Sequence, residues 1–279
     1  MRVLMPESVS EALAFKATNP DIVPIAGGTD LLVQWPGQLE RQAASYLDLS
    51  GLDELRTIRW TQDTLELGAL TTYWDTLCQP RVGVEHPLLH DAARQVGAIQ
   101  IQTRGTWAGN IINASPAADG VPVLMAYDAT VVLASVDGER QVPLSAFYHG
   151  YKQLEARPHE LIRKILVPRR EHDVQFFEKV APRQAQAITV VGVTVAHSSC
   201  GWRVVASSMA PTVCRCPHLE SLLQEGTPVS CPEDLLEPLR ADVSPIDDLR
   251  SSAHYREQVM SRVLYFNLGE TCPAFRSTR

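Results

Sequence analysis

Two short segments combine glycines with a hydroxyl side chain and a nearby Asp or Asn, a set of residues suited to binding a diphosphate. The first glycine loop is residues 25–32, Ile-Ala-Gly-Gly-Thr-Asp-Leu-Leu, and the second is residues 103–110, Thr-Arg-Gly-Thr-Trp-Ala-Gly-Asn. Glycine lets backbone N–H groups approach phosphate oxygens closely, and the hydroxyls add further donors. One such loop is weak evidence, but two in one chain indicate a dinucleotide whose diphosphate is held from both sides.

Neither glycine loop has the form of a standard nucleotide-binding motif. The G-x-x-x-x-G-K-[ST] and G-x-G-x-x-G patterns are both missing from these segments. Taken singly, residues 26–28 and 108–110 are also compatible with ordinary turns. Asp119, two residues before Val121-Pro122, is typical of a carboxylate that faces the N-terminus of a helix.

The composition limits the class of protein. The chain has 279 residues, 45% hydrophobic and 20% charged, and at about 100–200 residues per domain this length indicates two domains. The formal net charge of −7 and the lack of a basic run argue against a nucleic-acid partner. No apolar stretch approaches the ~20 residues that span a bilayer, and residues 1–6 do not resemble a signal peptide, so we expect a cytoplasmic location without a membrane span.

The cysteines and histidines predict neither a metal site nor a catalytic residue. No C-x-x-C pair is present, and no Cys/His group has the spacing of a metal site. Cys214 and Cys216 flank Arg215, and we interpret them as two reduced thiols in a loop rather than as metal ligands, with no disulfides in a reducing cytoplasm. The eight histidines show no pairing that suggests an acid or a base.

The elements that position the two loops follow from the hydrophobic pattern. A brief strand over residues 21–25 leads into the first glycine loop, and Ser8 and Glu11 have the spacing of a capping box at the start of a helix over residues 8–18. Further strands are expected over residues 45–49, 64–69, 129–135, 160–167, 176–180, 188–196 and 202–207, with a hairpin turn at residues 137–138. Further helices are expected over residues 72–78, 87–96, 121–127, 218–224 and 251–264. The pattern changes after residue 170, so we place a domain boundary near residue 171.

The glycine loops resemble those of a known family. Residues 24–32 look like the first FAD loop of the flavoprotein, or medium, subunits of molybdenum hydroxylases of the xanthine dehydrogenase and carbon monoxide dehydrogenase type. Residues 105–111 and 113–119 look like their second loop. Other similar segments follow in the expected order: residues 142–144 with Phe147, 160–162, 167–168, Lys179 with Arg183, 210–212 and 248–256. Because the resemblance covers nearly the whole chain, it is more specific than either loop alone.

The resemblance implies an α+β fold. We expect a PCMH-type FAD-binding domain over residues 1–170, made of two subdomains at about 1–57 and 58–170. A C-terminal α+β domain with an antiparallel sheet would then occupy residues 171–279.

The resemblance also implies residues that contact FAD. Those expected around the diphosphate are Ala26, Gly27, Gly28, Thr29, Asp30 and Leu31 from the first loop, and Thr106, Ala108, Gly109 and Asn110 from the second. Asp119 matches an acidic position whose carboxylate accepts hydrogen bonds from cofactor hydroxyls. Ile162 or Arg163 lies near a position that touches the flavin. Lys179 matches a lysine that reaches the cofactor, and a solvated surface lysine is the other interpretation.

Four positions depart from the family pattern. Ala108 replaces the first of two glycines before Asn110, and a methyl group there penalises a positive φ. Gln102-Thr103 replaces an Arg-Asn pair, so a hydrogen bond or salt bridge is expected to be lost. Trp107 has two interpretations, a contact with the isoalloxazine ring or a buried anchor under the loop.

The function implied by the resemblance is electron transfer. A partner subunit with a molybdenum–pterin centre would hydroxylate the substrate, a small [2Fe–2S] subunit would pass electrons to FAD, and FAD would deliver them to NAD+ or another acceptor. A dimer of heterotrimers is the expected assembly, with molybdopterin and iron–sulfur clusters outside this chain. Two alternatives stay open, a free-standing FAD-dependent oxidoreductase and a non-catalytic scaffold that has lost FAD.

Overall fold

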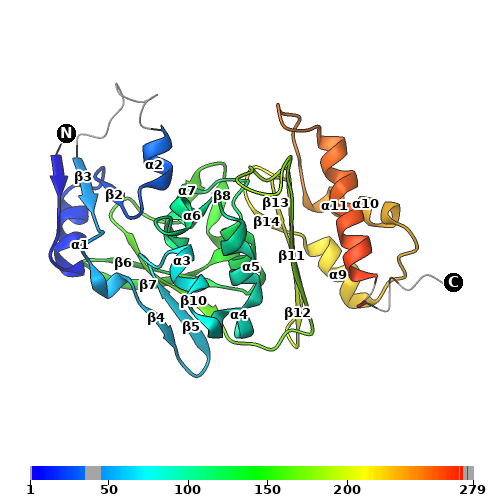
Figure 1. The fold of residues 1–279 in the computed structure, drawn as a ribbon, viewed down its shortest axis with the longest axis horizontal. Helices are drawn as coiled ribbons and strands as arrows, with labels where there is room; N and C mark the ends of the chain where they lie inside the picture. The colour runs from blue at the N-terminus through cyan, green and yellow to red at the C-terminus, as the bar shows by residue number, and fades with distance from the viewer. Residues whose placement is uncertain (1, 35–44, 270, 273–274, 276–279) are drawn as a thin grey trace.

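The N-terminal residues build a small parallel sheet that leads into the first glycine loop. The computed structural model describes residues 2–34, 45–269, 271–272 and 275. Strands β1 (Arg2–Leu4), β3 (Ser45–Asp48) and β2 (Val23–Ile25) lie in that order and run parallel. Helix α1 (Val9–Thr18) connects β1 to β2, and helix α2 (Thr29–Gln34) begins inside the loop (Figure 1).

Helix α1 begins where its capping residues predict. Ser8 Oγ accepts a hydrogen bond from Glu11 N at 3.2 Å. The Glu11 carboxylate accepts one from Glu7 N at 2.7 Å, one residue before the N–H that a regular capping box uses. At the other end, Lys16 Nζ donates to the carbonyls of Pro20 (2.7 Å) and Ile22 (2.8 Å), which ties the helix to the segment that enters β2.

A five-stranded antiparallel sheet is built from strands between residues 58 and 168. Its order is β4 (Ile58–Trp60), β5 (Thr64–Gly68), β10 (Leu161–Pro168), β6 (Thr130–Ser135) and β7 (Gly138–Pro143). Strand β6 is apolar and buried along its middle, as a strand covered on both faces should be. The register of β10 against β6 shifts between Ile162 and Lys164, which marks an irregularity in the strand.

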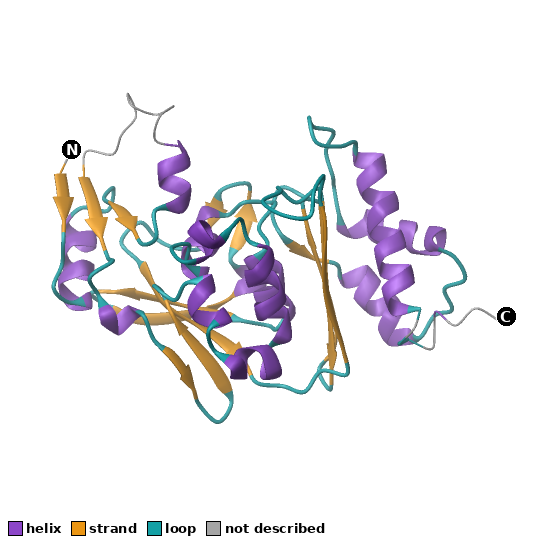
Figure 2. Cartoon of the chain, viewed as in Figure 1, coloured by secondary structure: helices purple, strands orange, loops and turns teal. Residues whose placement is uncertain are grey.

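Short helices lie between this sheet and the C-terminal sheet (Figures 1 and 2). They are α3 (Tyr73–Leu77), α4 (Pro80–Glu85), α5 (Pro87–Gln95), α6 (Ile99–Gln102), α7 (Trp107–Asn113) and α8 (Gly120–Ala126). A small hairpin, β8 (Tyr148–Gly150) with β9 (Gln153–Leu154), and the 3-10 turns η2 (Asp53–Leu55) and η3 (Leu144–Ala146) complete this part.

The C-terminal sheet is covered on both faces. Strands β11 (Val174–Val180), β12 (Val191–Ser198), β13 (Gly201–Ser207) and β14 (Cys214–Arg215) are antiparallel and adjacent in that order. Helices α9 (Pro217–Glu225) and α11 (Ala253–Leu268) pack on one face, and α5 and α8 pack on the other. Helix α10 (Leu236–Asp242) packs against α9 and α11, and the 3-10 turn η4 (Pro232–Leu235) packs against α10 and α11 (Figure 1). Strand β12 is therefore buried at nearly every residue.

The expected α+β fold with a C-terminal antiparallel sheet is confirmed, but the second glycine loop differs from the expectation. Residues 107–113 are helical, because Thr106 Oγ1 accepts from Gly109 N at 3.0 Å and caps the helix. Tyr148 Oη also donates to Ile111 O at 3.0 Å. Gly and Asn are weak helix formers, so the local pattern indicated a turn. The pattern also missed β1, β4, β8, β9, β14, α4, α6 and α10.

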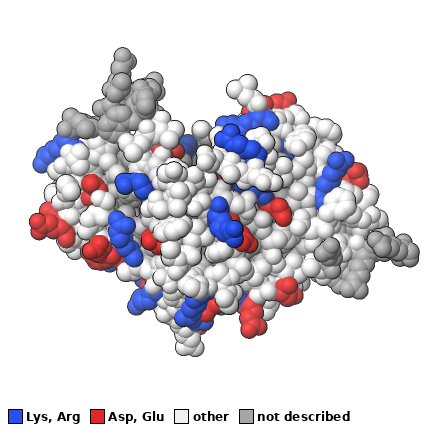
Figure 3. Space-filling model, viewed as in Figure 1, with Lys and Arg blue, Asp and Glu red and all other residues white. Residues whose placement is uncertain are grey.

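Charged side chains of both signs are interspersed on the face drawn in Figure 3. A nucleic-acid-binding surface gathers Lys and Arg on one face. Among the described residues, the displayed face shows no such one-sided gathering of Lys and Arg.

Candidate functional site

The two glycine loops touch each other through their backbones. A Cβ placed on Gly27 would lie 1.7 Å from the carbonyl oxygen of Arg104, far inside van der Waals contact. Arg104 Nε in turn donates to Gly27 O at 3.3 Å. Gly28 adopts a φ of +70°, which glycine tolerates at little cost. Both glycines of the first loop are thus needed for the loop's shape and for its contact with the second loop.

Further contacts join the helices that follow the loops. Asn113 Nδ2, at the end of α7, donates to Asp30 Oδ1 in α2 at 3.0 Å. Gly105 packs beside Thr29, because a Cβ placed on it would lie 3.4 Å from Thr29 Oγ1. The N-terminal part and the part that follows it therefore meet at the two loops, as well as where α1 packs on β6.

A cavity of about 550 Å³ opens beside this junction. Small-molecule and cofactor sites occupy about 300–1,000 Å³, so its size suits a cofactor. The site residues expected from the sequence that line it are Ala26, Gly27, Gly28, Thr29, Asp30, Leu31, Thr106, Ala108, Gly109, Asn110 and Ile162. Residues more than 130 positions apart in the chain thus share one cavity.

The cavity wall also includes residues that sequence reasoning missed. These include Lys16 on α1, Tyr73 on α3 and Leu133 on β6, together with residues 154, 156–158, 160 and 161. Burial lowers the pKa of the Lys16 ammonium, whose two carbonyl contacts hold it in the wall. The only sequence signal for Lys16 was its place among the apolar residues of an otherwise ordinary helix.

Trp107 and Tyr73 form an aromatic pair beneath the second loop. Their ring centroids lie 4.8 Å apart, and Trp107 is fully buried. Tyr73 lines the cavity, whereas Trp107 does not line it in the described part of the chain. Within the described residues, Tyr73 Oη, Trp107 Nε1 and Asn110 Oδ1 are buried without a hydrogen-bond partner. Such groups are rare in folded proteins and call for an explanation.

Asp119 and Lys179 contact each other. Lys179 Nζ lies 2.6 Å from Asp119 Oδ2, and Thr189 Oγ1 donates to Asp119 Oδ1 at 2.6 Å. Lys179 Nζ also donates to Gln95 O at 3.1 Å. Burial raises the pKa of the Asp119 carboxyl, although the Lys179 ammonium acts in the opposite direction. The pair joins α8 to β11, and neither residue lines the cavity in the described part of the chain.

Two departures from the family pattern have a simple structural outcome. Ala108 lies in helix α7 and is not among the residues with positive φ, so the expected backbone penalty does not arise. Gln102 Nε2 donates to the carbonyls of Arg94 (3.2 Å) and Val96 (3.1 Å), and Thr103 Oγ1 donates to Ile99 O at 2.9 Å. The Gln-Thr pair therefore makes hydrogen bonds of its own.

Family comparisons agree with this geometry. Residues 1–170 match the model of the FAD binding domain in molybdopterin dehydrogenase, and residues 176–271 match that of the CO dehydrogenase flavoprotein C-terminal domain. The chain belongs to the FAD-binding medium subunits of molybdenum hydroxylases. As a member of this family it is an oxidoreductase subunit.

Individual relatives are similar over much of their length. The chain is 36% identical to the nicotinate dehydrogenase FAD-subunit of Eubacterium barkeri over 67% of this chain and 65% of that protein, slightly less than two thirds of the relative. It is 30% identical to the glyceraldehyde dehydrogenase medium chain of Sulfolobus acidocaldarius over 91% and 92%. Among solved structures, a carbon monoxide dehydrogenase chain from Hydrogenophaga pseudoflava superposes with a TM-score of 0.87 at 25% identity, covering 99% of this chain and 98% of that one.

The residues of this flavoprotein subunit fit the FAD that the family implies. The junction of the loops offers glycines and hydroxyls, and the buried hydroxyl of Tyr73 lacks a partner within the described residues. Leu31, Leu133 and Ile162 give the cavity apolar walls. Polar groups converging on a cavity with apolar walls are what a dinucleotide with an aromatic ring system requires.

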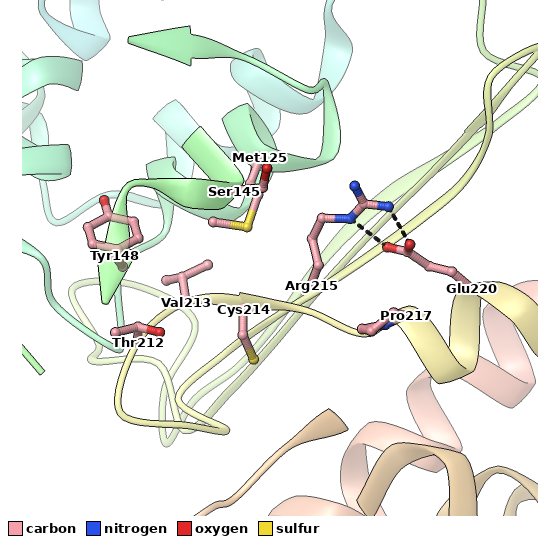
Figure 4. Close-up of a pocket in the computed structure, with 9 residues that line it drawn as sticks. All are labelled: Met125, Ser145, Tyr148, Thr212, Val213, Cys214, Arg215, Pro217 and Glu220. Atoms are coloured by element: carbon pink, nitrogen blue, oxygen red, sulfur yellow. Dashed lines mark hydrogen bonds and ion pairs between the residues drawn. The ribbon is translucent and has the colours of Figure 1, made fainter. Parts of the chain in front are cut away.

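A second cavity of about 490 Å³ lies between the FAD-binding part and the C-terminal sheet (Figure 4). Figure 4 shows Arg215 and Glu220 paired with each other, and Arg215 Nε donates to Glu220 Oε1 at 2.9 Å. Tyr148, on its wall, already donates to Ile111 O. Its strongest polar groups are therefore occupied by protein partners, unlike Tyr73 in the first cavity.

The described residues contain no cluster of three or more metal-binding side chains, and no helix among them is long and apolar enough to cross a bilayer. Cys214 lies in the short strand β14 rather than in a loop. Its thiol contacts that of Cys216, a hydrogen bond that raises the pKa of Cys216 and lowers the pKa of Cys214.

Proposed function

We propose that the subunit holds FAD in the cavity beside the glycine loops, receives electrons from the [2Fe–2S] clusters of a small partner subunit and delivers them through FAD to NAD+ or another acceptor. A large molybdopterin subunit would carry out the hydroxylation, and two heterotrimers would pair into a dimer. The observation that carries the proposal is the meeting of two glycine loops from distant parts of the chain over a cavity of cofactor size.

The residues of the two loops would bind the diphosphate. The first turn of a helix has N–H groups without intrahelical partners, and α2 and α7 both begin at the cavity wall. Thr29 and Thr106 add hydroxyl groups to that wall. Leu31 and Ile162 would exclude water from the ring system. When bound, FAD supplies the one-electron and two-electron redox chemistry that the side chains lack.

We propose that Asp119 and Lys179 reach the cofactor from the side of the C-terminal sheet. The negative charge of Asp119 is close enough to contribute to the raised pKa of Tyr73, although burial is the larger cause. Tyr73 lies in the cavity wall, so the Asp119–Lys179 pair is near that wall. Trp107 supports the same wall through its ring contact with Tyr73, and a direct contact with the flavin stays a prediction.

The substrate of the complex would bind another subunit. The relatives are parts of dehydrogenases named for nicotinate, glyceraldehyde and carbon monoxide, although their flavoprotein chains are similar to this one. We therefore propose no substrate for this chain, and purines, aldehydes, N-heterocycles and carbon monoxide all stay open.

The first test is the visible spectrum of the purified chain after incubation with FAD and gel filtration. We expect flavin absorption to co-elute with the protein and to be lost in Gly27→Trp, because any side chain there collides with the backbone of Arg104. Gly51→Trp is the matched control, since a Cβ at Gly51 meets nothing within 4 Å. A folded, colourless wild-type protein would favour the scaffold alternative.

The second test concerns the acceptor and the partners. The FAD-loaded chain is reduced chemically under anaerobic conditions and mixed with NAD+, and recovery of the oxidised flavin spectrum would support NAD+ as acceptor. Reduction of the flavin by an organic substrate without any partner subunit would instead favour the free-standing oxidoreductase. Co-purification with iron–sulfur and molybdenum subunits tests the heterotrimer.

A further inference from the structure

Tyr73 has a hydroxyl group that the protein leaves without a partner. The side chain is fully enclosed by the protein, at 2% exposure, yet its ring forms part of the cavity wall. No acceptor for Tyr73 Oη exists among the described residues. A buried hydroxyl without a hydrogen bond destabilises the folded chain by about 1–3 kcal/mol. A ligand that supplies an acceptor for Tyr73 Oη would remove this penalty.

The surroundings of the Tyr73 ring indicate which part of a bound ligand would accept a hydrogen bond from the hydroxyl. A Cβ placed on Gly105 would lie 3.4 Å from both Tyr73 Cε2 and Thr29 Oγ1, so the ring edge next to the hydroxyl borders the junction of the two glycine loops. Tyr73 N also donates to Gly105 O at 3.2 Å, which fixes the residue against the second loop. The ring also packs on Trp107, with the two ring centroids 4.8 Å apart.

We propose that the Tyr73 hydroxyl donates a hydrogen bond to a diphosphate oxygen of the bound FAD, an inference that rests on the proposed function. Tyr73 is thereby a cofactor-binding residue outside both glycine loops. Its role is to position the diphosphate against Thr29 and Gly105.

The electrostatics agree with a donor role. Burial raises the pKa of the Tyr73 phenol well above its ordinary value, and the negative charge of Asp119 acts in the same direction. The phenol therefore keeps its proton at neutral pH and can donate a hydrogen bond to an anionic oxygen. Hydrogen bonds to charged acceptors are stronger than neutral ones.

Tyr73→Phe removes the hydroxyl and keeps the ring that packs on Trp107. We expect the FAD dissociation constant, measured by quenching of flavin fluorescence on the FAD-free chain, to rise roughly ten- to hundred-fold. The FAD-free variant should unfold in urea at the same or a higher midpoint than the wild type, because no hydrogen bond is lost without the ligand.

Tyr127→Phe is the matched control. Tyr127 is equally buried, but its hydroxyl accepts from Leu88 N (3.1 Å) and donates to Gln175 Oε1 (2.7 Å). Its loss should lower the urea midpoint of the FAD-free chain and leave FAD affinity unchanged. Both substitutions delete one oxygen, but Tyr73→Phe should change FAD affinity and Tyr127→Phe should change the stability of the FAD-free chain.

The 31P NMR spectrum of bound FAD locates the contact. We expect a diphosphate resonance to move in Tyr73→Phe and to stay in place in Tyr127→Phe, with the flavin absorption maximum unchanged in both. Unchanged FAD affinity, a destabilised FAD-free Tyr73→Phe chain, or a shifted flavin absorption with unmoved 31P resonances would each overturn the assignment. A wild-type chain that binds no FAD would overturn the proposed function itself, whereas equal binding by wild type and Tyr73→Phe overturns only this inference.

Discussion

At the scale of single residues, Gly27 shows how one missing side chain allows the site to form. Its α-carbon faces the backbone of Arg104, where even a methyl group would overlap the carbonyl oxygen. Backbone cannot rotate aside as a flexible side chain can, so any larger residue must separate the two loops. The requirement at this position is steric and lies between loops, in addition to the close approach to phosphate that glycine permits.

Gly27→Ala is therefore expected to weaken both the fold and the cofactor site. We predict a loss of about 1–3 kcal/mol in the free energy of unfolding, typical of overpacking, together with reduced FAD retention after gel filtration. Gly51→Ala, in open space, should stay within about 0.5 kcal/mol of the wild type. Equal urea midpoints for the two variants would show that the loops separate without cost.

His86 is a buried histidine whose titration makes stability depend on pH. It is 1% exposed, Nε2 contacts Pro168 O at 3.3 Å, and burial lowers its pKa to about 4. Between its ordinary pKa of about 6.5 and that value, the unfolded chain binds a proton at His86 that the folded chain does not. The free energy of unfolding therefore falls as the pH falls through this window.

We predict that this contribution amounts to about 1.4 kcal/mol per pH unit between about pH 6.5 and pH 4. Urea unfolding of wild type and His86→Phe at pH 7.5 and pH 5.5 measures it, because the variant lacks the titrating group. The difference in free energy of unfolding between wild type and His86→Phe should shrink or reverse at the lower pH. Parallel losses of stability in both proteins would mean that other groups cause the pH dependence.

At the scale of elements, the Asp119–Lys179 pair joins α8 to β11 across the interface between the FAD-binding part and the C-terminal sheet. The side chains are 11% and 6% exposed, so both charges are largely removed from water. Removing one partner of a buried pair leaves an uncompensated charge and is strongly destabilising, whereas removing both is much less so.

Lys179→Met is expected to lower the free energy of unfolding of the FAD-free chain by about 3–5 kcal/mol. The double variant Lys179→Met, Asp119→Asn should recover much of that loss, because the neutral amide can still accept from Thr189. A double-mutant cycle in urea gives the coupling between the two positions. Additive losses would show that the two charges do not depend on each other in the folded chain.

At the scale of the whole molecule, the cofactor would act as a link between parts of the chain. The cavity wall comes from the first parallel sheet and its loop, from α1, α3 and α7, and from the region of β10. A ligand that binds only when these parts are assembled stabilises the folded state by RT ln(1 + [L]/Kd).

The thermal midpoint of the chain should therefore rise steadily with FAD concentration. The expected gain is about 2.7 kcal/mol when free FAD exceeds its Kd a hundred-fold. Differential scanning calorimetry at increasing FAD concentrations measures it, and Gly27→Trp should show little or no shift. An unchanged wild-type midpoint at saturating FAD would contradict the assembly of the site from these separate parts.

Much of this architecture can be predicted from the local sequence. Ser8 with Glu11 marks the start of α1, and the apolar runs of β6 and β12 mark strands covered on both faces, because each signal depends only on neighbouring residues. Helix α7 was missed because its Gly and Asn residues are weak helix formers, although Thr106 caps it locally. The hydroxyl of Tyr148, 37 positions away from Ile111, helps to hold a segment whose own residues favour a turn.

The sequence alone determined the family, the α+β fold and the two glycine loops. The residues of each motif are contiguous, and the order of the motifs along the chain can be recognised without a structure. Only the tertiary structure decided that Gly27 faces Arg104, that Asp119 pairs with Lys179 and that Tyr73 lines the cavity with an unpartnered hydroxyl. The physical reason is distance along the chain. The first two contacts join residues 77 and 60 positions apart, and the third depends on which face of a short helix the packing turns toward the cavity. No local pattern of hydrophobicity or charge specifies either.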